Sequence, residues 1–307
     1  MTNPFNYLIY FIMYYRRKVL LALIQAFEGK LEKITLQKLL FLFTRMQEKQ
    51  SFHFVPYKFG CFSYQANADL FTMAKYGHVI EKKNNWIMTC STDFISLLKD
   101  REKQILKSIK QVYGRLKSKN ELIRYTYLKY PYFAINSNLA QKLLTKKEYS
   151  SVKKQYPKYE KTALFTIGYE GKSLEEYLNK LIQNDIKVLC DVRKNPLSMK
   201  YGFSKKQLKN ATDNLGIIYL HFPEFGIESN KRQNLKTQQD YDKLLKKYKK
   251  QTLAKTKSSQ GKILKLMLDY KRTALTCFEA NIHQCHRTYV AEAITDLPDW
   301  KYELIHI

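Results

Sequence analysis

Five short apolar runs alternate with amphipathic helical patterns in the second half of the chain, and this alternation constrains the fold more than any other feature. The runs have the length and content of buried strands and lie at residues 163–167, 188–192, 217–222, 273–278 and 302–307. The helical patterns between them lie near residues 174–181, 208–215, 241–248 and 290–297, and Ser173 with Glu176 forms a capping box. Because parallel strands need right-handed crossovers, the alternation predicts a three-layer α/β sandwich with a mostly parallel sheet of about five strands.

The first half of the chain has a helical pattern instead. From Leu36 onward, apolar residues recur at helical spacing after Thr35, which we interpret as an N-cap. A second helix is expected over residues 64–76, and the apolar segments at 78–80 and 86–88 predict a hairpin. Helix, helix and hairpin in this order resemble a winged helix.

The remaining patterns of the first half predict helices at 95–116, 121–129 and 138–147. Pro157 stands in a polar, lysine-rich stretch that is typical of a boundary. At roughly 150 residues per domain, a chain of 307 residues is expected to form two domains. We therefore expect a mainly helical domain at 1–157 and an α/β domain at 158–307.

The charge of the chain is strongly basic. Lys and Arg number 54 against 27 Asp and Glu, for a net charge of +27, which favours DNA, RNA or a phosphate-bearing substrate as a partner. Only 10 of the 54 basic residues are Arg, and lysine is the less geometrically specific cation. Much of the charge, including the lysine-rich stretch at 243–257, is therefore also consistent with a solvated surface.

The cysteines and the N-terminal segment indicate the cellular compartment in which the protein is expected. The five cysteines form no CxxC pair and follow no secretory signal, so we expect reduced thiols and a cytoplasmic protein. The apolar segment at residues 5–15 is too short to span a bilayer, and its basic cluster follows it instead of preceding it. We expect no membrane association, and we leave open whether residues 1–12 are an upstream extension ahead of Met13.

Chemistry in an open α/β sheet is expected beyond the carboxyl ends of the strands. The candidate residues follow the carboxyl ends of the first four predicted strands or lie in the loop after the third strand. They are Gly168, Tyr169, Asp191, Arg193, His221, Glu224, Arg232, Cys277, Glu279, Cys285, His286 and Arg287. We predict that these groups meet around one solvent-accessible hollow.

The residue types suggest separate roles. We expect Arg193, Arg287 and the backbone amides near Gly168 to hold phosphate. Tyr169, His221 and Arg232 are further substrate-binding candidates. The catalytic candidates are Asp191, Glu224 and Glu279 as acid, base or metal ligand, Cys285 as a nucleophile at a helix N-terminus, and His286 as a proton shuttle.

Each candidate also has a structural interpretation. Asp191 and Arg193 would lie on the same face and could form an ion pair, and His221 could be a hydrogen-bonded core histidine. Cys277 is interpreted as a small apolar side chain. Cys277, Cys285, His286 and a carboxylate lack any standard metal-ligand spacing, so we assign no metal ligand, and the cofactor is unknown.

Four motifs in the second half resemble, in order, those of the domain-of-unknown-function family 488, over about residues 161–307. They are Thr166–Tyr169, Asp191-Val192-Arg193 with Pro196, Tyr219–Glu224, and Cys277-Phe278-Glu279 with Cys285-His286-Arg287. The resemblance implies no settled reaction. The glycine-rich or basic segment usual in the family after the third motif is here the segment 225–232, so what this loop recognises is not implied.

The first half resembles the Panacea or SocA-like domain of antitoxins and phage-associated proteins, over about residues 30–90. The resemblance rests on Leu36–Phe41 and Phe54–Ser63, followed by a helix toward Tyr76. It implies a regulatory or partner-binding role, so a protein partner or DNA is expected to bind through this half.

Together these features predict an enzyme that hydrolyses a phosphodiester or N-glycosidic bond in a nucleic acid or nucleotide, in a defence or stress context. The alternative is a non-catalytic regulator whose C-terminal pocket senses an anionic ligand while the N-terminal domain binds DNA or protein. A third interpretation is that the polar residues form a structural network, in which case Asp191→Asn destabilises the fold without changing binding.

Overall fold

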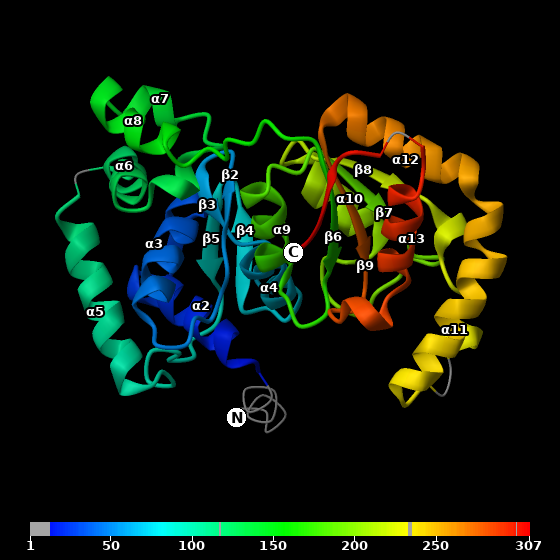
Figure 1. Ribbon diagram of the computed structural model, residues 1–307. Coiled ribbons are helices and arrows are strands. Elements are labelled where there is room, and N and C mark those ends of the chain that lie inside the picture. The colour runs from blue at the N-terminus through cyan, green and yellow to red at the C-terminus, as the bar shows by residue number, and fades with distance from the viewer. Residues whose placement is uncertain (1–12, 117, 233–234, 299) are drawn as a thin grey trace. The chain divides into compact units, whose positions relative to one another are not determined.

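The computed structural model describes residues 13–116, 118–232, 235–298 and 300–307 (Figure 1). The chain divides into two compact units, Met1–Tyr156 and Pro157–Ile307, where the sequence placed the boundary after Pro157. Most of the apolar segment at 5–15 lies outside the described residues. No helix in the described ranges is long and apolar enough to cross a bilayer.

The first unit is mainly helical and holds two small antiparallel sheets. Its helices are α2 (Tyr15–Ala26), α3 (Lys33–Met46), α4 (Tyr64–Lys75), α5 (Asp100–Gly114), α6 (Lys119–Lys129), α7 (Ala140–Leu143) and α8 (Lys146–Lys153), with the 3₁₀ turn η1 (Pro131–Ala134). Its strands are β1 (Lys30–Glu32), β2 (Val55–Tyr57), β3 (Gly60–Phe62), β4 (Val79–Lys82) and β5 (Asn85–Met88). The strand order β1-β5-β4 gives the predicted hairpin a third strand, and β2–β3 is a separate hairpin between α3 and α4.

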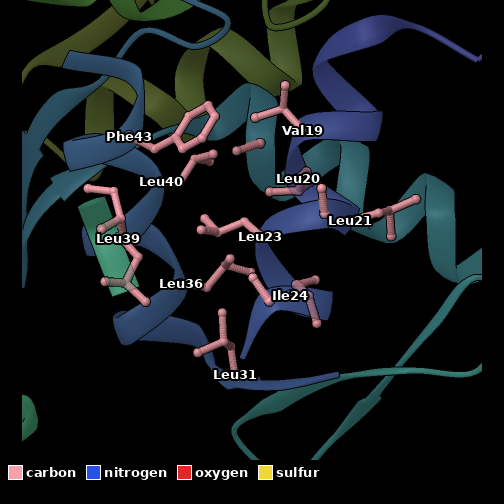
Figure 2. Close-up of a cluster of buried hydrophobic side chains, with 14 of the residues drawn as sticks. Val19, Leu20, Leu21, Leu23, Ile24, Leu31, Leu36, Leu39, Leu40 and Phe43 are labelled. Atoms are coloured by element: carbon pink, nitrogen blue, oxygen red, sulfur yellow. The ribbon is translucent and has the colours of Figure 1, made fainter. Parts of the chain in front are cut away.

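The core of the first unit forms between α2 and α3 (Figure 2). The predicted stripe of α3 is buried, because Leu36, Leu39, Leu40 and Phe43 are each at most 1% exposed. The prediction that Thr35 caps this helix is wrong: α3 already begins at Lys33, so Thr35 is an interior residue. The helix predicted at 138–147 is in fact two, α7 and α8, because the chain extends at Leu144 before Thr145 caps α8.

The second unit alternates strands and helices as predicted. Its strands are β6 (Ala163–Gly168), β7 (Val188–Asp191), β8 (Ile218–His221), β9 (Arg272–Cys277) and β10 (Glu303–His306). Its helices are α9 (Leu174–Gln183), α10 (Lys205–Asp213), α11 (Gln238–Gln251), α12 (Lys257–Tyr270) and α13 (His286–Thr295), with the 3₁₀ turns η2 (Pro223–Phe225), η3 (Ser229–Arg232), η4 (Leu253–Lys255) and η5 (Ile282–Gln284). The sheet has the order β10-β6-β9-β7-β8, and all neighbouring strands are parallel, which confirms the predicted fold class.

The strand order determines which helices cover which face of the sheet. The chain runs from β6 to β7 and β8 in one direction across the sheet and then returns to β9 and β10. With right-handed crossovers, α9 and α10 cover one face and α11 to α13 cover the other. In Figure 1, α9 and α13 accordingly lie on opposite sides of the β6–β9 pair.

Alternation along the strands directs neighbouring side chains to these two faces. On β9, Thr276 accepts a hydrogen bond from Tyr177 of α9, whereas the next residue, Cys277, packs in the core formed with α11 to α13. On β7, Cys190 belongs to that same core, so Asp191 points to the face of α9 and α10. The side chains of Asp191 and Cys277 therefore point to opposite faces of the sheet.

Candidate functional site

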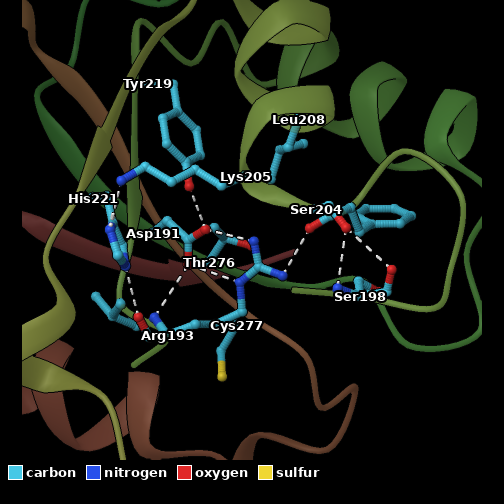
Figure 3. A network of polar contacts seen from close by, with 12 residues as sticks. Asp191, Arg193, Ser198, Ser204, Lys205, Leu208, Tyr219, His221, Thr276 and Cys277 are labelled. Carbon is cyan, nitrogen blue, oxygen red and sulfur yellow. Dashed lines mark hydrogen bonds and ion pairs between the residues drawn. The ribbon is translucent and has the colours of Figure 1, made fainter. Parts of the chain in front are cut away.

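The predicted site residues form two clusters at the carboxyl end of the sheet. Asp191, Arg193 and Tyr219 belong to one cluster, on the face of α9 and α10. Cys277, Glu279, Cys285 and His286 belong to the other, on the opposite face. Figure 3 shows the sulfur of Cys277 pointing away from the network of Asp191. The carboxylate of Asp191 and the thiol of Cys277 thus belong to different clusters, although Tyr169, Arg193, Arg232 and Cys277 line one cavity.

The first cluster is a buried ion pair. Arg193 donates from Nε to Asp191 Oδ1 at 2.8 Å and from Nη2 to Asp191 Oδ2 at 2.5 Å. Tyr219 donates from its hydroxyl to Asp191 Oδ2 at 2.6 Å, and burial together with this carboxylate raises the pKa of Tyr219. Asp191 is 0% exposed and Arg193 is 6% exposed, so the pair is shielded from water.

The guanidinium of Arg193 has little capacity left for a substrate. Its Nη1 donates to the Tyr169 hydroxyl at 2.8 Å and to the Phe203 carbonyl at 2.9 Å. With the two bonds to Asp191, four of the five N–H groups of an arginine are used within the protein. Burial opposes the charge of Arg193, but the bonds to Asp191 outweigh it and raise the pKa of Arg193. These contacts favour the structural interpretation of the pair.

His221 and Glu224 also have partners within the protein. Lys205 donates to His221 Nδ1 at 3.1 Å, so His221 carries its proton on Nε2 and donates it to the Arg193 carbonyl at 2.9 Å (Figure 3). Glu224, on η2, is exposed and accepts a hydrogen bond from Ser259. His221 thus supports the backbone of Arg193, and Glu224 is not among the described residues that line the cavity discussed below.

Gly168, Tyr169 and Arg287 position the loop that follows β9. The amides of Tyr169 and Glu170, expected to face an anion, instead donate to the Phe278 carbonyl at 3.1 and 2.9 Å. A Cβ on Gly168 would lie 1.9 Å from the Glu279 carbonyl oxygen, so glycine is required for this close approach. Arg287 is 2% exposed and donates to the carbonyls of Glu279 and Ala280, which fixes the same loop from the other side.

The second cluster gathers sulfur, nitrogen and oxygen atoms. Cys277 ends β9, Cys285 is the N-cap of α13, and both thiols lie 3.1 Å from Glu279 Oε2. His286 Nδ1 lies 3.6 Å from the Cys277 sulfur. One ligand atom from each of Cys277, Glu279, Cys285 and His286 lies within 4.8 Å of the other three.

Arg232 completes this cluster and determines which ring nitrogen of His286 carries the proton. The guanidinium donates from Nη1 to Glu279 Oε1 and from Nη2 to His286 Nδ1, the latter at 2.7 Å. Because a guanidinium can only donate, His286 Nδ1 presents its lone pair, and Nε2 donates to the Val192 carbonyl at 2.9 Å. The Nδ1 lone pair is therefore directed at the cluster.

The pKa values of the two thiols are shifted in opposite directions. Burial disfavours the Cys277 thiolate, but the thiol of Cys285, His286 and Arg232 outweigh burial and hold the pKa of Cys277 well below its ordinary value. Burial and the neighbouring Cys277 raise the pKa of Cys285 well above its ordinary value. Activation of Cys285 by the helix N-terminus stays a prediction, and the burial of this thiol and the adjacent sulfur oppose it.

A cavity of about 310 Å³ opens beside the second cluster. Its lining includes Tyr169, Arg193, Lys194, Asn195, Leu197, Ser198, Met199, Ile227, Arg232, Cys277 and Phe278. A smaller cavity of about 50 Å³ is lined by Glu279 and His286 and shares Ile227 and Arg232 with the larger one. The cluster therefore borders space that a ligand can occupy, with Cys277 at the larger cavity.

The lining combines cations with exposed apolar groups. Lys194 is exposed, and Arg232 reaches in from η3. On the loop between β7 and α10, Leu197 is 75% exposed and Met199 is fully exposed, and Phe278 is 43% exposed. Ser204 accepts from the Ser198 amide at 3.1 Å and so anchors this loop (Figure 3).

The first unit holds a larger cavity of about 470 Å³. It is lined mainly by apolar and aromatic groups such as Tyr57, Phe59 and Trp86, together with the buried Lys38, which donates to the Cys61 carbonyl at 3.0 Å. Because the described acid, base and metal-ligand groups cluster in the second unit, we place the candidate site there and not in this cavity.

The sequence analysis favoured an apolar interpretation of Cys277 and made no metal assignment for its set with Cys285 and His286, and it did not single out Lys194. A signal for Cys277 was available, because Glu279 follows it by two residues where the buried strand ends. The loop at 194–203 carried no comparable signal, since exposed apolar residues such as Leu197 and Met199 form no periodic pattern.

Comparison with known families gives one match. Residues 173–294 match the family described as Domain of unknown function DUF488. The segment begins at the N-cap of α9 and ends within α13, so it contains both clusters, and it supports the resemblance of the C-terminal half to this family. No curated protein and no solved structure matches the chain. The resemblance of the first half to the Panacea or SocA-like domain stays a prediction.

Proposed function

We propose that the second unit is a hydrolase that acts on a nucleic acid or nucleotide, cleaving a phosphodiester or N-glycosidic bond in the 310 Å³ cavity. One observation carries the proposal: this cavity brings together three cationic side chains, an exposed aromatic and apolar rim, and the thiol of Cys277, and Glu279 and His286 line the smaller cavity beside it.

The lining matches the two chemical parts of a nucleotide. Lys194 and Arg232 supply positive charge for a phosphate, and Arg232 can do so while it remains bonded to Glu279. Phe278, Leu197 and Met199 offer exposed apolar surface against which a base can pack. The buried Arg193 and Arg287, which sequence reasoning assigned to phosphate, act here as positioning residues.

The cluster supplies groups for proton transfer. In hydrolysis a water molecule adds its hydroxyl to phosphorus or to the sugar carbon, and its proton passes to the leaving group. Glu279 and His286 line the smaller cavity that adjoins the larger one, and each can hold or release a proton. Cys277 lies where the cluster meets the larger cavity.

The first unit would dock the polyanion or a partner protein. Residues 1–156 carry 27 basic and 10 acidic side chains, a net charge of +17. Such a surplus attracts nucleic acid through phosphate contacts that depend on salt. This role stands apart from the chemistry assigned to the second unit.

The proposal is tested by turnover of the full chain on DNA and RNA oligonucleotides, dinucleotides and nucleoside monophosphates, with and without divalent metals. We expect Cys277→Ser and Lys194→Glu to lower the rate by roughly 100-fold or more. Cys190→Ala is the matched control, because Cys190 is a buried thiol on the neighbouring strand that does not line the cavity, and it should keep wild-type activity.

Equal rates for all variants, or turnover of none of these substrates, would overturn the proposed hydrolase. Stabilisation of the folded chain by a nucleotide without turnover would instead favour the alternative, a regulator that senses an anionic ligand, since a ligand that binds only the folded state raises the melting temperature.

A further inference from the structure

Four donor atoms of the second cluster are arranged as the ligands of a metal ion would be. They come from Cys277, Glu279, Cys285 and His286, and they lie within 4.8 Å of one another. Each residue comes from a structurally fixed position: β9 ends at Cys277, the loop of Glu279 is held by Arg287, and α13 begins at His286. Residue types that ligate metals thus converge without any standard sequence spacing.

The spacing of these atoms agrees with a tetrahedral zinc site. Zn²⁺ binds sulfur at about 2.3 Å and nitrogen or carboxylate oxygen at about 2.0–2.2 Å, so its ligand atoms lie roughly 3.3–3.8 Å apart. Cys277 Sγ and His286 Nδ1 are 3.6 Å apart, and each sulfur is 3.1 Å from Glu279 Oε2. These three spacings lie within a few tenths of an ångström of the tetrahedral values, but the widest pair of the four atoms is as far as 4.8 Å apart, so that pair must close by about 1 Å to seat the ion.

Outer contacts of the kind that orient metal ligands are already present. His286 donates from Nε2 to the Val192 carbonyl, so Nδ1 is the nitrogen that can ligate a metal once Arg232 no longer donates to it. Glu279 uses Oε1 for Arg232 and directs Oε2 toward the two thiols. Binding of a metal requires only that Arg232 release His286 Nδ1 while it keeps its bond to Glu279.

The charges of the ligands, Arg232 and a bound divalent ion would sum to zero. Two thiolates and one carboxylate carry three negative charges, and Arg232 with one divalent cation carries three positive charges. Burying a net charge is costly, so a divalent ion completes this set where Arg232 alone does not. The two sulfur ligands and the imidazole select a soft or borderline ion over Mg²⁺ or Ca²⁺.

From this geometry we propose that Cys277, Glu279, Cys285 and His286 form a binding site for one Zn²⁺ ion at the edge of the 310 Å³ cavity. The inference deepens the proposed hydrolase, and any use of the ion in that reaction rests on the proposed function. The binding itself is measured without turnover.

The test measures metal bound to the full-length chain under reducing conditions. The protein is equilibrated with ZnCl₂, desalted, and its zinc content is determined by mass spectrometry, and a parallel sample is titrated with Co²⁺ and followed by absorbance. We expect one ion per chain and thiolate-to-cobalt charge-transfer bands. Cys277→Ser and Cys285→Ser should weaken binding by more than the roughly 10–100-fold that loss of an outer contact costs. Cys190→Ser is the matched control and should bind as the wild type does.

Three outcomes would overturn the zinc site. They are no bound ion in the wild type after equilibration, cobalt spectra without thiolate bands, and equal binding in the wild type, Cys277→Ser and Cys285→Ser. If the serine variants fail to fold, protection of the wild-type thiols from alkylation by added Zn²⁺ decides the question. Zinc binding without hydrolysis of any substrate would contradict the proposed function alone, and hydrolysis by a chain that binds no zinc would contradict the site alone.

Discussion

Replacing Asp191 by asparagine removes the charge that holds Arg193 in the second unit. The variant keeps the size of the side chain and one acceptor oxygen, but the guanidinium, 6% exposed, loses its anionic partner. Removal of one partner from a buried ion pair costs about 3–5 kcal/mol, because the remaining charge is left uncompensated. Since the asparagine oxygen still accepts one hydrogen bond, we expect about 3 kcal/mol, which is more than a hundredfold in the unfolding equilibrium.

Tryptophan fluorescence during urea unfolding of the full chain measures this loss for the second unit alone. The chain has two tryptophans, Trp86 in the first unit and Trp300 in the second, so Trp86→Phe leaves a single reporter in the second unit. The double variant Asp191→Asn with Arg193→Met removes both charges and should recover part of the stability. A loss below about 1 kcal/mol for Asp191→Asn would refute the reasoning, since it would mean that the pair contributes no more than an exposed one.

Three further predictions concern separate parts of the chain. Burial lowers the pKa of Lys38, so the unfolded chain binds the Lys38 proton more tightly than the folded chain does, and this difference costs stability below the ordinary pKa of lysine, about 10. Lys38→Met should therefore stabilise the first unit, with a gain that shrinks as pH rises toward that value. Urea unfolding followed through Trp86 at several pH values tests this, and a gain that grows with pH would contradict it. Gly168→Ala should lower the free energy of unfolding by at least about 2 kcal/mol and displace the loop of Glu279, because the added Cβ would lie 1.9 Å from a carbonyl oxygen. Gly261→Ala in α12, where no atom lies within 4 Å of the added Cβ, should raise the free energy of unfolding by about 0.5–1 kcal/mol. Equal melting temperatures for the two variants would contradict the argument. Oligonucleotide affinity should fall steeply with salt, and a filter-binding constant that does not change between about 50 and 200 mM salt would exclude phosphate contacts as its source.

The sheet of the second unit was predictable because its three central strands are buried on both faces and its two edge strands are still apolar runs. Each of the five strands lies within one of the apolar runs or differs from it by a residue, and the capping box of Ser173 and Glu176 is present as expected. The helix α12 was missed, since lysines and Gly261 interrupt the apolar pattern on which the prediction depended. Local chemistry therefore predicted the elements wherever burial made the pattern continuous.

The division of the site into two clusters could not be predicted, because it depends on the strand order. The sequence places Asp191 and Cys277 at two strand ends, but only the insertion of β9 between β6 and β7 determines how these residues face each other. Arg193 lies beyond the end of β7, so strand alternation does not govern it, and it folds back onto Asp191. The pairing of strands that are distant in the sequence, and not the local sequence pattern, determines which polar groups lie together.

The location of a bound product tests the central claim most directly. A crystal structure of the full chain with a nucleoside monophosphate should show the phosphate against Lys194 and Arg232 in the cavity that Cys277 lines. A nucleotide bound on the opposite face of the sheet beside Asp191, or in the 470 Å³ cavity of the first unit, would contradict the account.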